Sequence, residues 1–278
     1  MKVILVCYAT KDYYVSQAEL VRSARAQGIE RCLSLSPADI ESEFRQANSR
    51  ILSARKGAGY WLWKPYIILR ALEQAENDDT VLYVDSGARL VSSPKPLVGL
   101  CEENAGILLF QVHGRLNCEW TKQDCFHYMD CESERYYQQQ QVHGAFQLYK
   151  KCDRAVKFVR EYLYFCMDER IVTDMPNQCG QDNHALFKAH RHDQSVLSLL
   201  AARNRIEIHR DPSQFGNRYK REDCRVPSEY LGVPDAYAER PYLNSKYPTI
   251  FDHHRSHRVR GFAGIKAHLS KLKHTFQK

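Results

Sequence analysis

The stretch Thr80-Val-Leu-Tyr-Val-Asp-Ser-Gly87 decides the fold class of this chain. It begins as a short apolar run with β-branched residues, typical of a fully buried strand, and ends in side chains that favour a turn. The run from Val3 to Tyr8 has the same character. Helical patterns separate the two runs, from Ser16 to Gln27, from about Pro37 to Arg55 and from Pro65 to Ala75. Strands that alternate with helices predict a mostly parallel sheet with helices on its faces.

The remainder of the chain continues this alternation. Strands are expected at residues 31–35, 107–112, 142–148 and 205–209, and helices at residues 152–168 and 192–203. The polar stretch from Gly114 to Gln141 shows no clear period. A loop of that length inside a compact domain is usually functional or mobile. We therefore expect an α/β domain that contains one long loop of this kind.

The composition is that of a globular protein with one core. The chain has 278 residues, of which 44% are hydrophobic and 26% charged, which excludes disorder, collagen and coiled coil. Its 40 basic and 33 acidic residues give a net charge of +7. No acidic residue follows Asp252, and the basic residues beyond it account for the whole excess: Arg255, Arg258, Arg260, Lys266, Lys271, Lys273 and Lys278. We expect either an anionic partner at this end or a solvated tail.

Two features favour a reduced, cytoplasmic compartment. No run of 18 apolar residues is present, and the apolar run at the start is interpreted as a buried first strand, because it is too short for a signal peptide. The ten cysteines include no Cys-x-x-Cys pair, and several lie in apolar runs, where a thiol behaves as a small hydrophobe. The alternative is a zinc site, although the spacing of its candidate ligands matches no common zinc knuckle: Cys118, Cys125, Cys131 and His127.

The turn Asp85-Ser86-Gly87 lies at the carboxyl end of a predicted strand, where ligands bind in parallel sheets. A carboxylate followed by two small residues can approach a ribose hydroxyl or a hydrated metal ion without steric obstruction. The alternative is an aspartate that only caps the turn through its own backbone.

An aromatic and cationic segment precedes this strand. Gly57 and Gly59 lead into a group of large side chains, Tyr60, Trp61, Trp63, Lys64 and Tyr66. Lys64 lies next to a helix start and is a candidate to donate to a phosphate as a point charge. The alternative is a packed contact between helix and sheet, with the lysine extending its ammonium group to solvent.

Two later motifs carry titratable side chains. His190-Arg-His-Asp-Gln194 places Asp193 and Gln194 at the start of a helix, where an aspartate is also favoured for structural reasons alone. Phe251-Asp-His-His-Arg-Ser-His257 gathers three imidazoles and a carboxylate. Such a cluster can bind a divalent cation or a diphosphate.

The order of these motifs resembles that of GT-A fold glycosyltransferases, especially the bacterial hexosyltransferases of lipopolysaccharide and capsule synthesis. The run GAGYWLWKPYII at residues 57–68 and VLYVDSG at residues 81–87 carry the resemblance, which spans Lys2 to Arg260 in motif order. It implies a GT-A-like, Rossmann-type α/β fold with a mixed, mostly parallel sheet flanked by helices. Residues 1–260 would form the catalytic domain, and residues 261–278 a basic amphipathic C-terminal helix.

The resemblance implies transfer of a hexose from a UDP-sugar to a glycan or lipid-linked acceptor in cell-surface polysaccharide synthesis. Asp85 corresponds to the first acid of the family's DxD motif, whose carboxylates hold the ribose and a bridging Mn²⁺ or Mg²⁺. Gly87 replaces the second acid and removes one metal ligand, so Asp85 and His253 are the candidate ligands here. A metal-free site would neutralise the leaving diphosphate with basic side chains instead: Lys64, Arg89, His253, His254 or Arg255.

By the same resemblance, Asp193 and Gln194 lie beside the donor sugar and the acceptor. Asp193 is the expected general base if the reaction inverts the anomeric centre, and Gln194 lies under the anomeric carbon if the reaction retains it. His143 and Gly144 would line the sugar pocket. The remaining donor-site candidates are Tyr8, Thr10 and Asp12, for the uridine base and ribose, and Ser86.

The basic tail has two interpretations. Apolar residues with helical spacing lie among its lysines: Phe262, Ile265, Leu269, Leu272 and Phe276. Such a helix suits peripheral contact with an anionic membrane surface, where a lipid-linked acceptor resides, or it docks on the domain or on a second subunit.

Two other functions stay open on the sequence. A non-catalytic nucleotide- or sugar-binding module of the same fold is favoured by the glycine at position 87. A nucleic-acid-binding protein is favoured by the basic tail. The remainder of the chain has no net charge, which makes this the weakest of the three interpretations.

Overall fold

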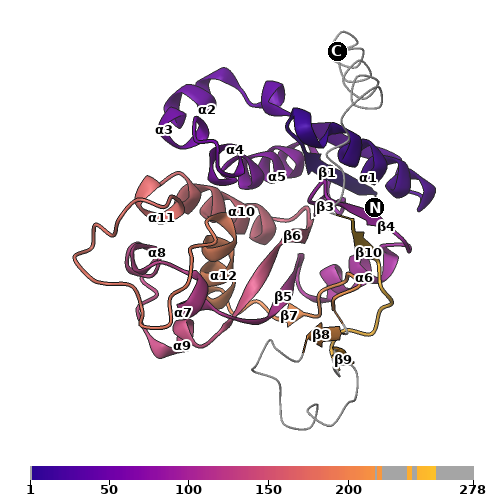
Figure 1. Ribbon diagram of the computed structural model, residues 1–278. Helices are drawn as coiled ribbons and strands as arrows, with labels where there is room; N and C mark the ends of the chain where they lie inside the picture. Colours follow the sequence, from indigo (N-terminus) through magenta and orange to yellow (C-terminus); the bar gives the residue numbers. More distant parts are fainter. Residues whose placement is uncertain (1, 217, 221–236, 240–242, 255–278) are drawn as a thin grey trace.

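The computed structural model describes residues 2–216, 218–220, 237–239 and 243–254. Its strands are β1 Val3–Tyr8, β2 Arg31–Leu35, β3 Thr80–Val84, β4 Ala88–Leu90, β5 Ile107–Leu116, β6 Gln140–Lys150, β7 Ile208–His209, β8 Arg218–Lys220, β9 Tyr237–Glu239 and β10 Phe251–His253. The main sheet has six strands in the order β2-β1-β3-β6-β5-β7 (Figure 1). Two small antiparallel pairs, β4 with β10 and β8 with β9, lie outside it.

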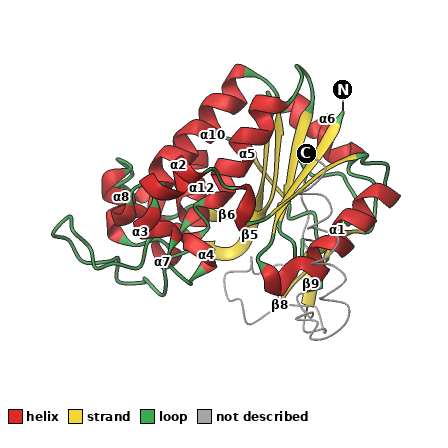
Figure 2. Cartoon of the chain, turned by 90° about the horizontal axis from the view of Figure 1, so that it is seen from above, coloured by secondary structure: helices red, strands yellow, loops and turns green. Residues whose placement is uncertain are grey.

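Helices cover both faces of the main sheet (Figure 2). They are α1 Tyr14–Ala26, α2 Ser42–Ala47, α3 Ser49–Leu52, α4 Gly57–Tyr60, α5 Trp63–Gln74, α6 Lys95–Glu103, α7 Asn117–Trp120, α8 Gln123–Tyr128, α9 Glu134–Tyr137, α10 Asp153–Cys166, α11 Glu169–Val172 and α12 Asp193–Arg203. Helices α5, α10 and α12 lie on one face, and α1 and α6 on the other. The architecture is the predicted α/β arrangement.

The direction of the strands brings distant residues to one edge of the sheet. All strands of the main sheet run the same way except β6, which is antiparallel to both of its neighbours, β3 and β5. The mixed, mostly parallel sheet is therefore confirmed. The carboxyl ends of β1 and β3 meet the amino-terminal half of β6, and the backbone N–H of Asp85 donates to the carbonyl of Ala145 at 2.9 Å. This is the edge at which α/β sheets bind ligands.

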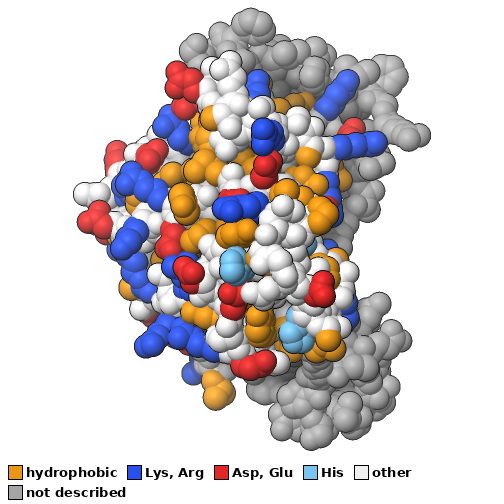
Figure 3. Space-filling view, turned by 90° about the vertical axis from the view of Figure 1, so that its left-hand side faces the viewer, with side chains coloured by type: hydrophobic (Ala, Val, Ile, Leu, Met, Phe, Trp, Pro, Cys, Tyr) orange, Lys and Arg blue, Asp and Glu red, His pale blue; other side chains and the backbone are white. Residues whose placement is uncertain are grey.

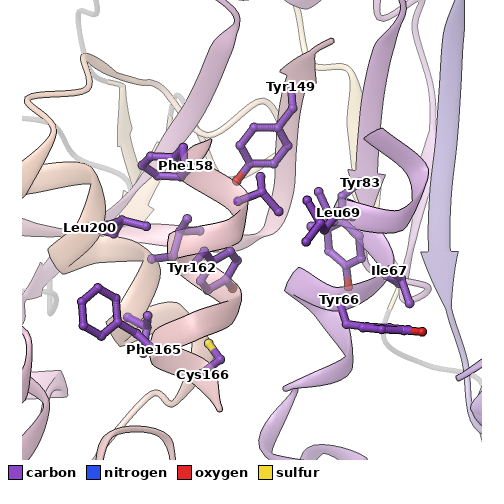
Figure 4. Packing of buried hydrophobic residues seen from close by; sticks show 14 of the residues in the cluster. Tyr66, Ile67, Leu69, Tyr83, Tyr149, Phe158, Tyr162, Phe165, Cys166 and Leu200 are labelled. Carbon is purple, nitrogen blue, oxygen red and sulfur yellow. The ribbon is translucent and has the colours of Figure 1, made fainter. Parts of the chain in front are cut away.

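The alternation of side chains along β1 and β3 builds two cores. Ile4 and Tyr83 point into the cluster formed with α5, α10 and α12. Leu5 and Leu82, one residue away on each strand, point into the cluster formed with α1 and α6. Successive residues of a strand face opposite sides of a sheet, so a strand buried on both faces has an unbroken apolar sequence. Figure 4 shows part of the first cluster, with side chains of α10 and α12 on one side and of α5 and β3 on the other.

A pairing between residues far apart in the sequence closes the edge near Asp85. β10 pairs antiparallel with β4, so that His253 lies opposite Ala88 (Figure 1). The adjacent N–H of His254 donates to the carbonyl of Gly87 at 3.0 Å. Both strands are short, and neither was predicted, because three-residue strands leave little hydrophobic period in a sequence.

A single helix was expected from about Pro37 to Arg55, and this prediction is wrong because the segment is divided. A 3-10 turn at Pro37–Asp39 is followed by α2 and α3 as separate short helices. The Asp39 carboxylate accepts the backbone N–H of Ser36 at 2.8 Å and fixes the turn, after which Ile40 is extended. Asn48 then ends α2 by donating its side-chain amide to the carbonyl of Phe44 at 2.9 Å. Local side-chain hydrogen bonds of this kind compete with helix continuation.

The stretch from Gly114 to Gln141 is likewise more regular than expected. β5 extends into it, and α7, α8 and α9 fill most of the remainder. The segment is held by polar contacts with residues 173–192. The buried Asp124 carboxylate accepts the backbone N–H groups of Gln178 and Cys179 at 2.9 Å, and Lys122 donates to the carbonyl of Met175 at 2.8 Å. These contacts connect distant segments and give the sequence no local period.

The nine cysteines of the described ranges are free thiols, and Cys118, Cys125 and Cys131 are fully buried. Among the described residues, no three His, Cys, Asp or Glu side chains are grouped to hold a metal ion, so the zinc alternative has no support there. No helix in the described part is long and apolar enough to cross a bilayer. The predicted helix at residues 261–278, and Arg255, lie outside the described residues.

Replacing Asp124 with alanine is expected to destabilise the fold by about 2–4 kcal/mol, because the N–H groups of Gln178 and Cys179 lose a charged acceptor. Burial alone would raise the pKa of Asp124, but these N–H groups outweigh it and hold the pKa below its usual value. The loss in free energy of unfolding should therefore have its maximum value above a pH of about 4. It should decrease as the pH falls through the pKa of Asp124 in the folded protein. Urea denaturation between pH 7 and pH 3 measures it.

Asp182→Ala is the matched control, since Asp182 is exposed and lies in the same segment that Asp124 anchors. Its free energy of unfolding should stay within about 0.5 kcal/mol of wild type. Equal losses for the two variants would contradict the anchoring role.

Candidate active site

A buried lysine joins three segments at the ligand-binding edge of the sheet. Lys64 Nζ lies 2.8 Å from Asp193 Oδ2 and 3.7 Å from Asp85 Oδ1, and it donates to the carbonyl of Gly144 at 3.1 Å. The side chains of Lys64 and Asp193 are 3% and 4% exposed, whereas that of Asp85 is 40% exposed. The alternative in which Lys64 extends its ammonium group to solvent is therefore wrong. The ammonium group is enclosed by protein oxygens, and Asp85 faces outward.

The segment before Lys64 is shaped by a left-handed turn. Ala58, Gly59, Tyr60 and Trp61 all have positive φ angles, between 49° and 100°. A side chain at Gly57 would collide with the Trp61 ring, since a Cβ built there lies 2.3 Å from it. Such conformations are costly and persist where surrounding structure holds them. This left-handed turn leads directly into α5. Lys64 lies in the first turn of that helix, and its side chain reaches the sheet.

Glycine at position 144 gives Lys64 the room to approach. A Cβ on Gly144 would lie 3.3 Å from Lys64 Nζ and 3.5 Å from the Cβ of Gln194. Gly144 also donates its N–H to Gln194 Oε1 at 3.4 Å. Gly144 and Gln194, each assigned to the sugar site from the sequence, are in contact, while a sugar pocket there stays a prediction.

Two buried tyrosines complete the hydrogen bonds of the carboxylates. The hydroxyl of Tyr83 donates to Asp85 Oδ1, and that of Tyr162 donates to Asp193 Oδ2 at 3.1 Å. Burial, followed by the neighbouring carboxylates, raises the pKa of both tyrosines well above the usual value. Both phenols therefore stay neutral and act as donors at physiological pH.

The charges of the central pair depend on one another. Burial alone would lower the pKa of Lys64, but the carboxylates of Asp193 and Asp85 outweigh it and raise the pKa above its usual value. Burial raises the pKa of Asp193, against the opposing attraction of Lys64. The lysine therefore stays protonated, and Asp193 is a stronger base than an exposed aspartate.

Gln194 is held in one orientation beside this pair. Its Oε1 accepts the N–H of Gly144, and its Nε2 donates to Gln141 Oε1 at 2.6 Å. Gln141 in turn donates to Thr121 Oγ1 at 3.1 Å and to the carbonyl of Trp120 at 3.2 Å. Gln194 is half-buried, so unlike Asp193 it retains access to solvent.

The two histidines before Asp193 are structural. His190 and His192 are buried, and each contacts a carbonyl of α11, those of Ile171 and Val172, at 2.8 Å. Burial lowers the pKa of His192 to about 4 and that of His190 well below its usual value. Both imidazoles are neutral at pH 7 and position the start of α12.

The late histidine motif does reach the site. His253 stacks on His143 with ring centroids 5.7 Å apart, and His143 Nε2 lies 3.7 Å from Asp211 Oδ2. The N–H of His254 donates to Gly87, as noted above. The predicted nearness of the histidine motif to the Asp85 turn is therefore seen in the structure. Its role in binding a diphosphate remains a prediction.

The end of β1 forms an aromatic wall. The ring of Tyr8 is buried and stacks on Trp63 at 4.0 Å between centroids. The hydroxyl of Ser86 donates to the carbonyl of Tyr8 at 2.7 Å and joins β1 to the turn after β3. Thr10 is half-buried and Asp12 exposed, in and beside the 3-10 turn that follows. The predicted base- and ribose-binding residues thus lie along one edge.

Two of the basic side chains expected near a diphosphate, Lys64 and Arg89, already pair with carboxylates. Lys64 pairs with Asp193, and Arg89 pairs with Asp252 at 2.9 Å. The central cluster has one ammonium group and two carboxylates, which leaves the exposed Asp85 with negative charge that Lys64 does not neutralise. Mg²⁺ in proteins is often held by one or two carboxylates together with substrate phosphates. Asp85 therefore fits a divalent cation that takes most of its ligands from a bound substrate.

The structure is similar to that of an active-site mutant of LgtC, with 15% identity and a TM-score of 0.46 over 97% of this chain and 95% of LgtC. It is also similar to mouse xyloside xylosyltransferase 1, with 10% identity and a TM-score of 0.46 over 94% of this chain and all of that one. WbbM, a bifunctional glycosyltransferase, has 11% identity and a TM-score of 0.41 over 72% of this chain, which spans 37% of WbbM. These similar structures are glycosyltransferases. No protein family model and no curated protein matches the sequence.

Several residues of the site were missed in the sequence. Tyr83 lies two residues before Asp85, on the same face of its strand, and this spacing is a signal that was present. Tyr162, Gln141 and Asp211 lie in other elements, and only the tertiary structure brings them to the site.

Lys64→Met is expected to lower the free energy of unfolding by about 3–5 kcal/mol, because it leaves Asp193 buried without its cation. The double variant Lys64→Met/Asp193→Asn should recover more than half of this loss, since the neutral amide still accepts from Tyr162. The folded pKa of Lys64 lies above its unfolded value, so the loss should persist to about pH 10 and decrease at higher pH. A double-mutant cycle in urea measures it. Additive losses in the two single variants would contradict the coupling.

Proposed function

We propose that this protein transfers a hexose from a UDP-sugar to a glycan or lipid-linked acceptor of cell-surface polysaccharide synthesis. The observation that carries the proposal is the buried pair Lys64–Asp193, with Asp85 turned outward beside it, at the carboxyl edge of the sheet. The order of the motifs, which resembles that of GT-A fold glycosyltransferases, supports it.

The donor would lie along the edge from β1 to β4. Tyr8, on its aromatic wall with Trp63, and the turn with Thr10 and Asp12 would contact the uridine. Asp85 would accept hydrogen bonds from the ribose hydroxyls, since its exposed carboxylate is an acceptor only. This arrangement leaves the diphosphate on the side of Gly87, close to the backbone of His253 and His254.

A divalent cation at Asp85 would neutralise the diphosphate as it leaves. The chain supplies the remaining contacts. His253 and His254 lie where they would donate to phosphate oxygens, and Lys64 fixes the Asp85 carboxylate in place through charge. The lysine contacts protein oxygens on several sides, so we assign it a positioning role rather than direct contact with phosphate.

The sugar would lie over Gly144, between His143 and Gln194. Gln194 is half-buried and fixed by two hydrogen bonds, which suits direct contact with the anomeric region. Asp193 is enclosed and paired, so it would act as a base for the acceptor hydroxyl only if the Lys64 contact loosens. Both anomeric outcomes remain compatible with these positions.

Calorimetric titration with UDP, with and without Mn²⁺, tests the donor site. Wild-type protein should bind UDP more tightly with Mn²⁺, and Asp85→Ala should weaken this binding at least tenfold, about 1.4 kcal/mol or more. Asp182→Ala is the matched control and should bind as wild type, because Asp182 is exposed and lies in the loop before α12, outside the segments that Lys64 joins.

Release of UDP from a panel of UDP-hexoses then separates a transferase from a binding module. Turnover that falls at least a hundredfold in Gln194→Ala, with UDP affinity unchanged, supports transfer. Binding without turnover would favour the non-catalytic module of the same fold. Absence of UDP binding under all conditions would overturn the proposal.

Gly87→Asp is expected to increase Mn²⁺-dependent UDP affinity by roughly tenfold, by supplying a second carboxylate beside Asp85. The fold should tolerate it, because a Cβ at Gly87 meets nothing within 4 Å. Gly99→Asp, at another position with open space, is the matched control in α6. A Gly87→Asp variant that folds and binds UDP without any added dependence on Mn²⁺ would show that no metal occupies this turn.

A further inference from the structure

A second group of charged side chains lies next to the candidate active site. The guanidinium carbon of Arg191 lies 4.3 Å, and that of Arg115 4.6 Å, from the ring centroid of Trp120. Lys188 Nζ lies 5.7 Å from the same ring, but it pairs with the buried Glu119 at 2.8 Å. Two arginines therefore make cation–π contacts with the same indole ring.

Neither arginine has a partner of opposite charge among the described residues. Within the part of the chain that the structure describes, neither guanidinium forms an ion pair or donates a hydrogen bond. Among the described residues, Nε of Arg191 and the indole N–H of Trp120 are buried and have no hydrogen-bond partner. Burial, and then the charge of Arg115, lower the pKa of Arg191. Contact with an aromatic face leaves the N–H groups of a guanidinium free to donate.

The arginines are connected to the site by short contacts. Arg191 lies two residues before Asp193, and its backbone N–H donates to the carbonyl of Trp120 at 3.1 Å. That carbonyl also accepts from Gln141, which binds Gln194 at 2.6 Å. A group bound to the guanidiniums would therefore lie on the Gln194 side of the central pair, away from the Asp85 turn.

We propose that Arg115 and Arg191, oriented by Trp120, form a subsite for an anionic acceptor, a sugar that carries a carboxylate or a phosphate group. The inference rests on the proposed glycosyl transfer and specifies its acceptor. Arginine binds both kinds of anion through paired N–H groups. Two guanidiniums against one ring, neither with a counterion among the described residues, gain most from such a ligand. On the face of the molecule seen in Figure 3, basic and acidic side chains are interleaved.

A purely structural role would hold the arginines on the indole without any preference for anions. The two roles differ in a measurable way. An anion subsite predicts that binding depends on the charge of the sugar, whereas packing alone predicts that only stability changes when an arginine is replaced.

The test is an NMR titration that measures the binding of three related sugars to the wild-type protein in the presence of UDP. The probes are methyl β-D-glucuronide, glucose 6-phosphate and the neutral methyl β-D-glucoside. At least one anionic probe should bind ten or more times as tightly as the neutral one. Comparison of the glucuronide with glucose 6-phosphate shows whether the subsite prefers a carboxylate or a phosphate group.

Arg191→Gln and Arg115→Gln should each remove the preference for an anionic sugar. Trp120→Phe should reduce it, because the smaller ring gives the two guanidiniums less aromatic surface to pack against. Arg31→Gln is the matched control, because Arg31 is exposed on the edge strand β2 and should leave the preference unchanged. Equal binding of charged and neutral probes, no binding of any probe, or a preference that survives Arg191→Gln overturns the subsite.

The outcomes separate this inference from the proposed function. Charge-selective glycoside binding in a protein that does not bind UDP would keep the subsite and reject transfer from a UDP-sugar. UDP binding and turnover without charge selectivity would reject the subsite and keep the proposed transfer.

Discussion

The ion pair between Lys64 and Asp193 is the interaction on which the rest of the site depends. A charge taken out of water is costly unless its hydrogen bonds are completed, and here the carbonyl of Gly144 and the hydroxyl of Tyr162 complete them. The pair joins the first turn of α5 to the start of α12, across the amino-terminal half of β6. Breaking it would leave a buried charge without a partner, so the three elements are constrained to one arrangement.

This constraint gives the edge of the sheet an uneven distribution of charge. Asp85 is drawn toward Lys64 but remains exposed, which makes the β3 end of the site an acceptor region suited to hydroxyl groups or a cation. On the other side of Gln194, Arg115 and Arg191 supply cationic donors. A donor substrate at the acidic end and an anionic acceptor at the basic end would thus meet over Gly144.

Contacts from outside the main sheet support both ends. The pairing of β4 with β10 holds His253 beside the Asp85 turn, and Ser86 ties that turn to β1. At the opposite end, Asp124 and Lys122 anchor the segment that leads to α12. An open groove of about 620 Å³ between α3, α10 and α11 lies apart from these contacts and includes the exposed Tyr164.

The sequence by itself determined the central strands and the position of Asp85. Val3–Tyr8 and Thr80–Val84 are unbroken apolar runs, and such runs specify buried parallel strands whose carboxyl ends form a ligand-binding edge. Only the tertiary structure decided that Lys64 is enclosed between carboxylates, that residues 117–137 form short helices, and that His253 returns to the Asp85 turn. The physical reason is that these features depend on single polar contacts between distant segments, which leave no hydrophobic period in the sequence.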